Sequence, residues 1–178
     1  MSTVDLMLLG ALIDEPLNAY EMKKKMDYRN IKEWVKISAP SIYKNLVKLH
    51  KKGYLDGETV KEGEMPEKKI YHINDKGRQH FMRLMKKYSD DPGRVYMDFT
   101  AFIANLHNLD KDTGLQMMTE MQNKFYTQMK IMERVIGEKS DVPYHARALI
   151  ELYLQIFTLI HDWSGKLKKE FIDHESGK

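Results

Sequence analysis

The chain of 178 residues contains no cysteine. Disulfide bridges, zinc sites with cysteine ligands and thiol catalysis are therefore excluded, and the absence fits a reducing compartment such as the cytoplasm. The sequence also lacks any run of 18 apolar residues, so no membrane-spanning helix is expected. No basic residue precedes the first apolar run, and Asp5 interrupts that run, so no signal peptide is expected. We expect a cytoplasmic protein without a membrane partner.

Motifs of enzyme active sites are missing as well. There is no glycine-rich phosphate loop, no nucleophile elbow and no carboxylate motif. The seven histidines are scattered, without metal-ligand spacing, at positions 50, 72, 80, 107, 145, 161 and 174. The sequence therefore predicts a protein that is not an enzyme, with no metal site and no cofactor.

Positive charge is concentrated in one part of the chain. Residues 1–90 hold 18 Lys+Arg against 13 Asp+Glu, whereas residues 91–178 hold 11 against 13. Within residues 29–52, seven basic residues accompany a single acidic one, Glu33, for a local net charge of +6. Such a cluster is a candidate footprint for a polyanion. An ordinary solvated surface can have the same composition, so charge alone leaves both interpretations open.

Two helices are predicted in the first 28 residues. The apolar stretch Thr3–Ile13 predicts a largely buried helix, which Pro16 brings to an end. Asn18, with Glu21 three residues later, has the spacing of a capping box. A second helix is therefore expected from Asn18 to Tyr28.

A third helix is predicted from Ser38 to Lys52. Ser38 is its N-cap, Pro40 fits the first turn, and Gly53 is a natural residue to end it. One face is apolar, with the spacing i, i+4, i+7, and consists of Ile42, Leu46 and Leu49. The opposite face carries Ser41, Lys44, Lys48 and Lys51. The lysines are therefore expected on a presented face, opposite the buried one.

A β-hairpin and a fourth helix follow. The extended runs Tyr54–Val60 and Lys68–Asn74 predict two strands, joined by a charged turn that contains Gly63 and Pro66. Asn74 is expected to cap the next helix. The apolar stripe of that helix comprises Phe81, Leu84, Met85 and Tyr88.

The remainder of the chain reads as helical. The charged stretch at residues 89–94, with adjacent proline and glycine, predicts a boundary between a domain of residues 1–90 and a domain of residues 91–178. Helices are expected from Val95 to Leu109, from Lys111 to Gly137, and over a final segment with the heptad-like seam Ala146, Leu149, Tyr153, Phe157, Ile160, Ser164, Leu167 and Phe171. We expect these seams to pack on each other and against a second copy of the chain.

The order of elements predicts a mainly α protein that begins with a winged helix-turn-helix. In this motif the second helix enters the DNA major groove. The predicted contacts to double-stranded DNA come from the third helix, with Ser38, Ser41, Tyr43, Lys44, Lys48 and Lys51, and from the wing, with Lys61, Lys68 and Lys69. The free N–H groups at the start of the third helix are further candidates for phosphate.

Three stretches resemble the PadR family of transcriptional regulators. They are "LLGALIDEPLNAYEMKKKM", "SAPSIYKNLVKLHKKGYL" and "EKKIYHINDKGRQHF", which span about residues 4–85 in the family's order. The longer helical remainder is similar to the larger PadR subgroup, which has a helical dimerisation domain. Asn18-Ala19 stands where the family usually has glycine, and Lys44-Asn45 replaces a common proline, so an operator sequence is not carried over. The resemblance implies a dimeric winged-helix regulator, usually a repressor, often relieved by a small molecule.

A small-molecule effector needs a pocket, and four apolar residues are candidates for its lining: Trp34, Met118, Phe157 and Trp163. Ordinary packing in a core or at an interface is the default explanation for them, since methionine and aromatic residues fill cores. A different function also stays open. Winged helices can serve as protein-interaction adaptors without a specific DNA target, but the row of lysines favours a DNA-binding transcriptional regulator.

Overall fold

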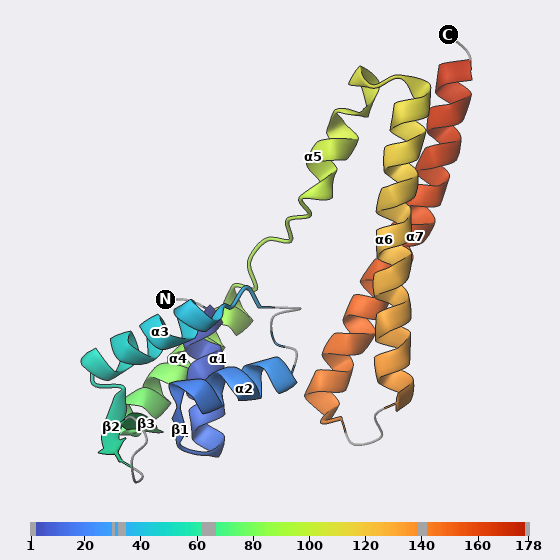
Figure 1. The fold of residues 1–178 in the computed structure, drawn as a ribbon. Coiled ribbons are helices and arrows are strands. Elements are labelled where there is room, and N and C mark those ends of the chain that lie inside the picture. Colours follow the sequence, from blue (N-terminus) through green and yellow to red (C-terminus); the bar gives the residue numbers. More distant parts are fainter. Residues whose placement is uncertain (1–2, 30, 32–34, 62–66, 139–141, 177–178) are drawn as a thin grey trace. The chain divides into compact units, whose positions relative to one another are not determined.

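The computed structural model describes residues 3–29, 31, 35–61, 67–138 and 142–176. The chain divides into two compact units, Met1–Val95 and Tyr96–Lys178. The first unit contains α1 (Thr3–Asp14), β1 (Leu17–Asn18), α2 (Ala19–Tyr28), α3 (Ala39–Lys51), β2 (Leu55–Val60), β3 (Lys68–Ile73) and α4 (Asp75–Asp90) (Figure 1). The predicted fold class is confirmed: the protein is mainly helical, with a small antiparallel sheet.

Helix α1 forms the centre of the first unit. It packs against α3 and α4, and the side chains of Leu8 and Leu9 have no exposed surface. The core around it consists of Val4, Leu8, Leu9, Ala11, Leu12, Leu17, Met22, Met26, Ile31, Ile42, Leu46, Leu49, Leu55, Tyr71 and Leu84. The predicted buried helix is confirmed, and it ends at Asp14, two residues before Pro16.

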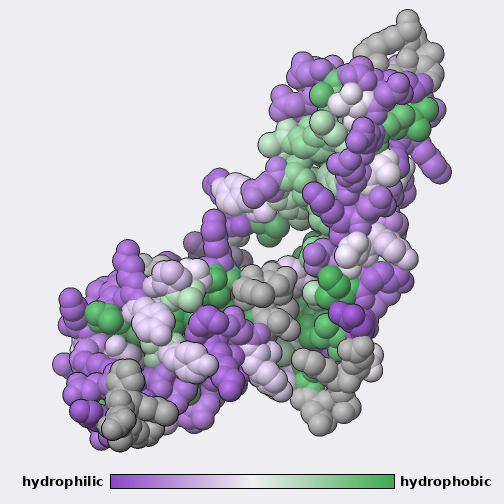
Figure 2. Space-filling model, in the orientation of Figure 1, coloured by the Kyte–Doolittle hydropathy of each residue, from purple (hydrophilic) through white to green (hydrophobic). Residues whose placement is uncertain are grey.

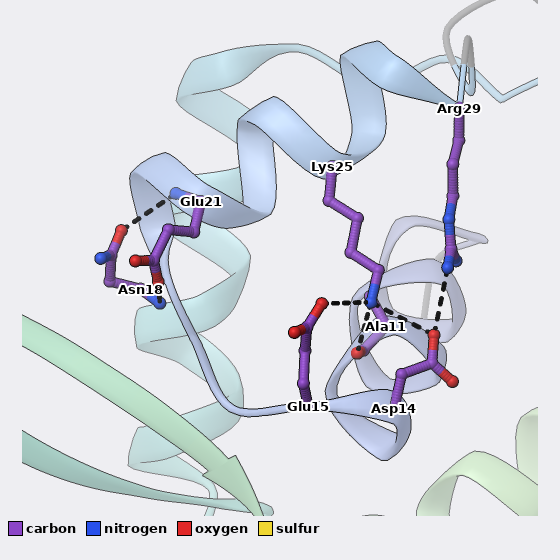
Figure 3. Close-up of polar contacts among 7 residues, drawn as sticks. All are labelled: Ala11, Asp14, Glu15, Asn18, Glu21, Lys25 and Arg29. Atoms are coloured by element: carbon purple, nitrogen blue, oxygen red, sulfur yellow. Dashed lines mark hydrogen bonds and ion pairs between the residues drawn. The ribbon is translucent and has the colours of Figure 1, made fainter.

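The capping box predicted for α2 is confirmed. The Asn18 side chain accepts hydrogen bonds from the backbone N–H groups of Tyr20 and Glu21, and the Glu21 carboxylate accepts one from the Asn18 N–H (Figure 3). These bonds satisfy donors that have no partner inside the helix. The start of α2 is therefore fixed by its own sequence.

A basic clamp joins α2 to the C-terminal end of α1. The Lys25 ammonium lies 3.2 Å from the Asp14 carboxylate and 3.0 Å from that of Glu15, and Arg29 also reaches Asp14 at 3.2 Å (Figure 3). Partial burial raises the pKa of Asp14, but hydrogen bonds from Lys25 and Arg29 and their positive charges outweigh it and hold the pKa below its usual value. The clamp therefore ties α2 to the C-terminal end of α1 across the turn between them.

The sheet has the strand order β1-β3-β2, and both pairings are antiparallel. The hairpin predicted from the two extended runs is confirmed, with a register that pairs Gly57 with Tyr71. The two-residue strand β1 was not predicted. Its Leu17 pairs with Tyr71 and its Asn18 with Ile70, so the residue that caps α2 also belongs to the sheet.

Helix α4 begins at the predicted cap, where Asn74 accepts from the Gly77 N–H. The predicted stripe is wrong at Met85, which is exposed, while His80 is buried and stacks on the Tyr54 ring at 4.2 Å. Met85 directly follows the buried Leu84, and its side chain therefore points away from the face of α4 that packs against α1. Burial lowers the pKa of His80, and nearby Arg83 lowers it further, which favours the neutral ring.

The second unit contains α5 (Phe99–Ala104), η2 (Leu106–Asn108), α6 (Lys111–Glu138) and α7 (Tyr144–Ser176). The predicted continuous helix from Val95 to Leu109 is wrong, because only Phe99–Ala104 is α-helical within it. Val95 and Tyr96 are exposed, so their side chains supply no buried face that could extend α5 backwards. No helix in the described part of the chain is long and apolar enough to cross a membrane.

Helices α6 and α7 pack on each other along most of their length. Their seam buries Met118, Met132, Ile150, Ile160 and Ser164. The seam differs from the prediction at Leu149, which is exposed, because Ile150 takes the buried place. The Phe171 ring fills the space that Gly114 leaves, since a Cβ atom at Gly114 would lie 2.6 Å from it.

Gly77 offers a test of the packing between α4 and the sheet. A Cβ atom at this position would lie 2.2 Å from the Tyr54 carbonyl oxygen, which is backbone and cannot swing aside. We expect Gly77→Ala to lower the free energy of unfolding by about 1–3 kcal/mol. Gly137→Ala is the control, because nothing lies near that position and alanine is the better helix former. Urea unfolding measures both, and equal stability of the two variants would contradict the packing described.

Candidate nucleic-acid interface

The two faces predicted for α3 are present. Ile42, Leu46 and Leu49 are buried against the core. The opposite side exposes Pro40, Tyr43, Lys44, Val47 and Lys51. Burial of one face therefore presents the other to solvent, and α3 contains no acidic residue.

Ser38 and Ser41 form a reciprocal cap at the start of α3. The Ser41 N–H donates to the Ser38 hydroxyl at 3.3 Å, and the Ser38 N–H donates to the Ser41 hydroxyl at 2.8 Å. The Ser41 hydroxyl also donates to the Ser38 carbonyl oxygen at 2.7 Å. Both serines predicted as DNA contacts therefore take part in the cap. The Ser41 hydroxyl proton is donated to the Ser38 carbonyl oxygen, whereas the Ser38 hydroxyl only accepts a hydrogen bond in the cap.

This cap also limits phosphate binding at the start of α3. Pro40 has no N–H, the Ser41 N–H is taken by Ser38, and the Ile42 N–H donates to the Ser38 carbonyl. Of residues 39–42, at most the Ala39 N–H remains for an anion. Backbone N–H groups at the start of α3 therefore offer little to a phosphate group, and lysine side chains are the main candidates for phosphate contacts.

Lys48 turns from the exposed face toward α1. Its ammonium lies 3.7 Å from a carboxylate oxygen of Asp5, a residue that is only 2% exposed. A buried carboxylate needs compensating charge, because desolvation strongly disfavours its ionised form. Lys48 thus has a structural partner inside the unit, which distinguishes it from Lys44 and Lys51, both of which are exposed.

On the wing, Lys69 is held by His50 of α3. The His50 Nδ1 lies 2.8 Å from the Leu55 carbonyl oxygen, so Nδ1 carries the proton and Nε2 accepts from the Lys69 ammonium at 2.8 Å. The Lys69 stem crosses Gly57, where a Cβ atom would lie 2.2 Å from the Lys69 Cε. The absence of a side chain at Gly57 therefore makes room for the link between wing and α3.

The other two lysines of the wing that were predicted to contact DNA, Lys61 and Lys68, differ in exposure. Lys61 is exposed at the end of β2, and Lys68 is half-buried on β3. The structure thus brings α3 and strand β3 of the wing together through His50 and Lys69, while Lys61 directly follows β2.

The residues predicted to line an effector pocket do not form one group. Trp34 lies outside the described residues, and Met118 is fully buried in the seam of α6 and α7. Phe157 and Trp163 belong to an aromatic cluster of the second unit, in which Phe99 lies 5.2 Å from Phe125 and 6.1 Å from Trp163. Among the described residues, no three His, Asp or Glu side chains form a group that could hold a metal ion.

The sequence interpretation missed Val47. A shallow hollow on the exposed face of α3 is lined by Ala39, Pro40, Tyr43, Lys44 and Val47. The signal was available, because Pro40, Tyr43 and Val47 have the spacing i, i+3, i+7 of a second apolar stripe. Lysines stand between these positions, so the face is basic in composition and its apolar stripe is visible only from the spacing.

Residues 8–83 match the model of the Transcriptional regulator PadR-like family. Most of the N-terminal unit is therefore similar to PadR-like regulators. This match covers all three stretches that carried the resemblance in the sequence, up to Phe81. A search of curated proteins found no match.

Solved structures extend the PadR likeness over nearly the whole chain. Bacillus subtilis PadR in complex with operator DNA has a TM-score of 0.79 at 19% identity, covering 96% of this chain and 98% of that one. The same protein in complex with p-coumaric acid has a TM-score of 0.79 at 16% identity, covering 94% and 98%. The Vibrio cholerae virulence activator AphA has a TM-score of 0.72 at 14% identity, covering 97% and 99%. At these identities the likeness shows that both units have the PadR fold.

The contact between Lys48 and Asp5 can be measured as a coupling. We expect Lys48→Ala to lower the free energy of unfolding by about 1–3 kcal/mol, because the cation beside a buried carboxylate is lost. In the Asp5→Asn background the same substitution should cost clearly less, since the charge that needs compensation is gone. Urea unfolding of the four proteins gives the coupling directly. An equal cost in both backgrounds would show that Lys48 contributes through its aliphatic stem alone.

Proposed function

We propose that this protein is a homodimeric, sequence-specific DNA-binding transcriptional regulator of the cytoplasm. The observation that carries the proposal is the exposed face of α3, which is basic and free of acidic residues, on a PadR-like winged helix. Helix α2 is the supporting helix, and α3 is the recognition helix that enters the major groove.

The charges on this unit support binding to the DNA backbone. Lys44 and Lys51 are exposed on α3, and Lys36 is exposed just before it. Lysines that neutralise phosphates release condensed counterions, so affinity falls steeply as salt rises. Tyr43, which is half exposed in the middle of the same face, is placed to contact phosphate or base edges.

A second apolar stripe on α7 supports dimerisation. Leu149, Leu152, Leu159 and Trp163 are exposed although they are large and apolar, and with Ile156 they have the alternating spacing of three and four. This stripe is separate from the seam with α6, and Figure 2 shows hydrophobic surface on the visible face of this unit. Burial against the same stripe of a second copy would join two DNA-binding units in one molecule, as a palindromic site with two half-sites requires.

Regulation by a small molecule is part of the proposal. Its support is the likeness to a PadR structure that contains p-coumaric acid. The aromatic cluster of Phe99, Phe125, Phe157 and Trp163 offers ring faces for an aromatic effector. Repression is the expected sign of regulation.

Selection from random DNA duplexes by the full-length protein, followed by fluorescence anisotropy at two salt concentrations, tests the proposal. We expect an enriched palindromic site, bound by two protomers and resistant to scrambled competitor DNA. Failure to enrich any sequence, together with salt-insensitive binding, would overturn the proposal in favour of a protein-interaction adaptor.

Lys44 and Lys51 should carry much of the affinity. We expect Lys44→Ala and Lys51→Ala each to weaken DNA binding and to make the logarithmic salt dependence shallower by about 2, because a dimer loses two phosphate contacts. Lys169→Ala, an exposed position of α7, is the charge-matched control and should leave both quantities unchanged. Identical behaviour of all three variants would remove α3 from the DNA interface.

The α7 stripe should determine the oligomeric state. We expect Leu152→Glu to weaken the dimer about a thousandfold, because each lost leucine contact is worth about 2 kcal/mol and occurs twice in a symmetric dimer. Asn123→Glu, at an exposed polar position of α6, adds the same charge and should leave the dimer intact. Sedimentation velocity over a concentration series reads out both variants. A dimer that survives Leu152→Glu places the interface elsewhere.

A further inference from the structure

Binding by electrostatic attraction alone requires only polar and charged side chains. The exposed face of α3 also carries apolar ones. Val47 is 43% exposed and Tyr43 is 50% exposed, and together with Ala39 and Pro40 they line the shallow hollow on this face. A valine left exposed on a recognition helix adds nothing to phosphate binding. The basic face therefore contains an apolar strip, Ala39, Pro40, Tyr43 and Val47, that is open to an occupant.

The strip lies at the centre of the positive charge. Lys44 shares the hollow with it, and Lys51 follows Val47 one turn later on the same side of α3. An occupant must therefore be apolar where it meets Val47 and surrounded by negative charge. The thymine C5-methyl group in the major groove, flanked by phosphates, is the apolar feature of DNA with these properties.

The dimensions agree with this occupant. Pro40 and Val47 are seven residues apart, which corresponds to about 10 Å along a helix axis. Successive base pairs are about 3.4 Å apart, so the strip has the length of about three base pairs. Small and branched apolar side chains contact thymine methyl groups without needing hydrogen-bond geometry.

We infer that the apolar strip of α3 reads thymine methyl groups of the operator, with Val47 as a specificity-determining residue. The inference rests on the proposed function, since it names the bases that the same site selects. Lys44 and Lys51 supply affinity for any DNA, whereas Val47 contacts the C5-methyl group, which thymine has and cytosine and uracil lack.

The experiment replaces thymines with deoxyuridine, one at a time, in the site selected by the full-length protein. Uracil keeps the hydrogen-bonding groups and lacks only the methyl group. We expect at least one replacement to weaken wild-type binding about three- to fourfold, the value of one buried methyl group. In Val47→Ala the affinity is lower and that replacement has no further effect. Lys51→Ala should bind more weakly and keep the full penalty for uracil.

Distinct outcomes separate this inference from the proposed function. A selected site in which every thymine tolerates uracil, or a penalty that persists in Val47→Ala, overturns the inference and leaves DNA binding intact. Failure to select any site overturns both. Val47→Ala should not change the mass of the DNA-free protein in sedimentation. A changed mass would assign the strip to a contact between copies of the chain, which also overturns the inference.

Discussion

The burial of one face of α3 is the constraint on which the rest of the first unit depends. Ile42, Leu46 and Leu49 are part of the core, and α3 packs against α1, α2 and β2. This burial fixes the rotation of α3 about its own axis. A helix that exposes the opposite side in a single orientation can offer its lysines and its apolar strip as one surface. The caps at Asn18, Ser38 and Asn74 fix where α2, α3 and α4 begin. The position of the exposed face is therefore fixed along the axis of α3 as well as by its rotation.

Positive charge on this surface differs from residue to residue. Lys48 compensates Asp5, and Lys69 donates to His50, so both are tied to the unit itself. Lys44 and Lys51 are exposed and available to a polyanion. A simple count of lysines overestimates the net charge that a ligand would meet, because the Asp5 carboxylate offsets the charge of Lys48. Lys69 keeps its charge, but its position is fixed by His50.

Local signals were sufficient for most of the first unit. The capping residues, Pro16 and the i, i+4, i+7 spacing in α3 predicted the helices, because each acts through its immediate neighbours in sequence. Strand β1, the exposure of Met85 and the pairing of Lys48 with Asp5 depend on residues far apart in the chain, and no local pattern reveals them. In the second unit, heptad spacing predicted two paired helices but placed Leu149 in the wrong seam, since α7 carries two adjacent apolar stripes and the pattern cannot assign a partner to each. The site residues themselves stay predictions, although the geometry now ranks them.

The strand β1 has a mechanical consequence. Asn18 pairs with Ile70 of β3 and also caps α2, and strand β3 of the wing is linked to α3 through Lys69 and His50. A displacement of β3 is therefore transmitted directly to the start of α2 through Asn18 and to the end of α3 through His50. The wing and the helix-turn-helix should therefore move together, so that a displacement of the hairpin also tilts α3.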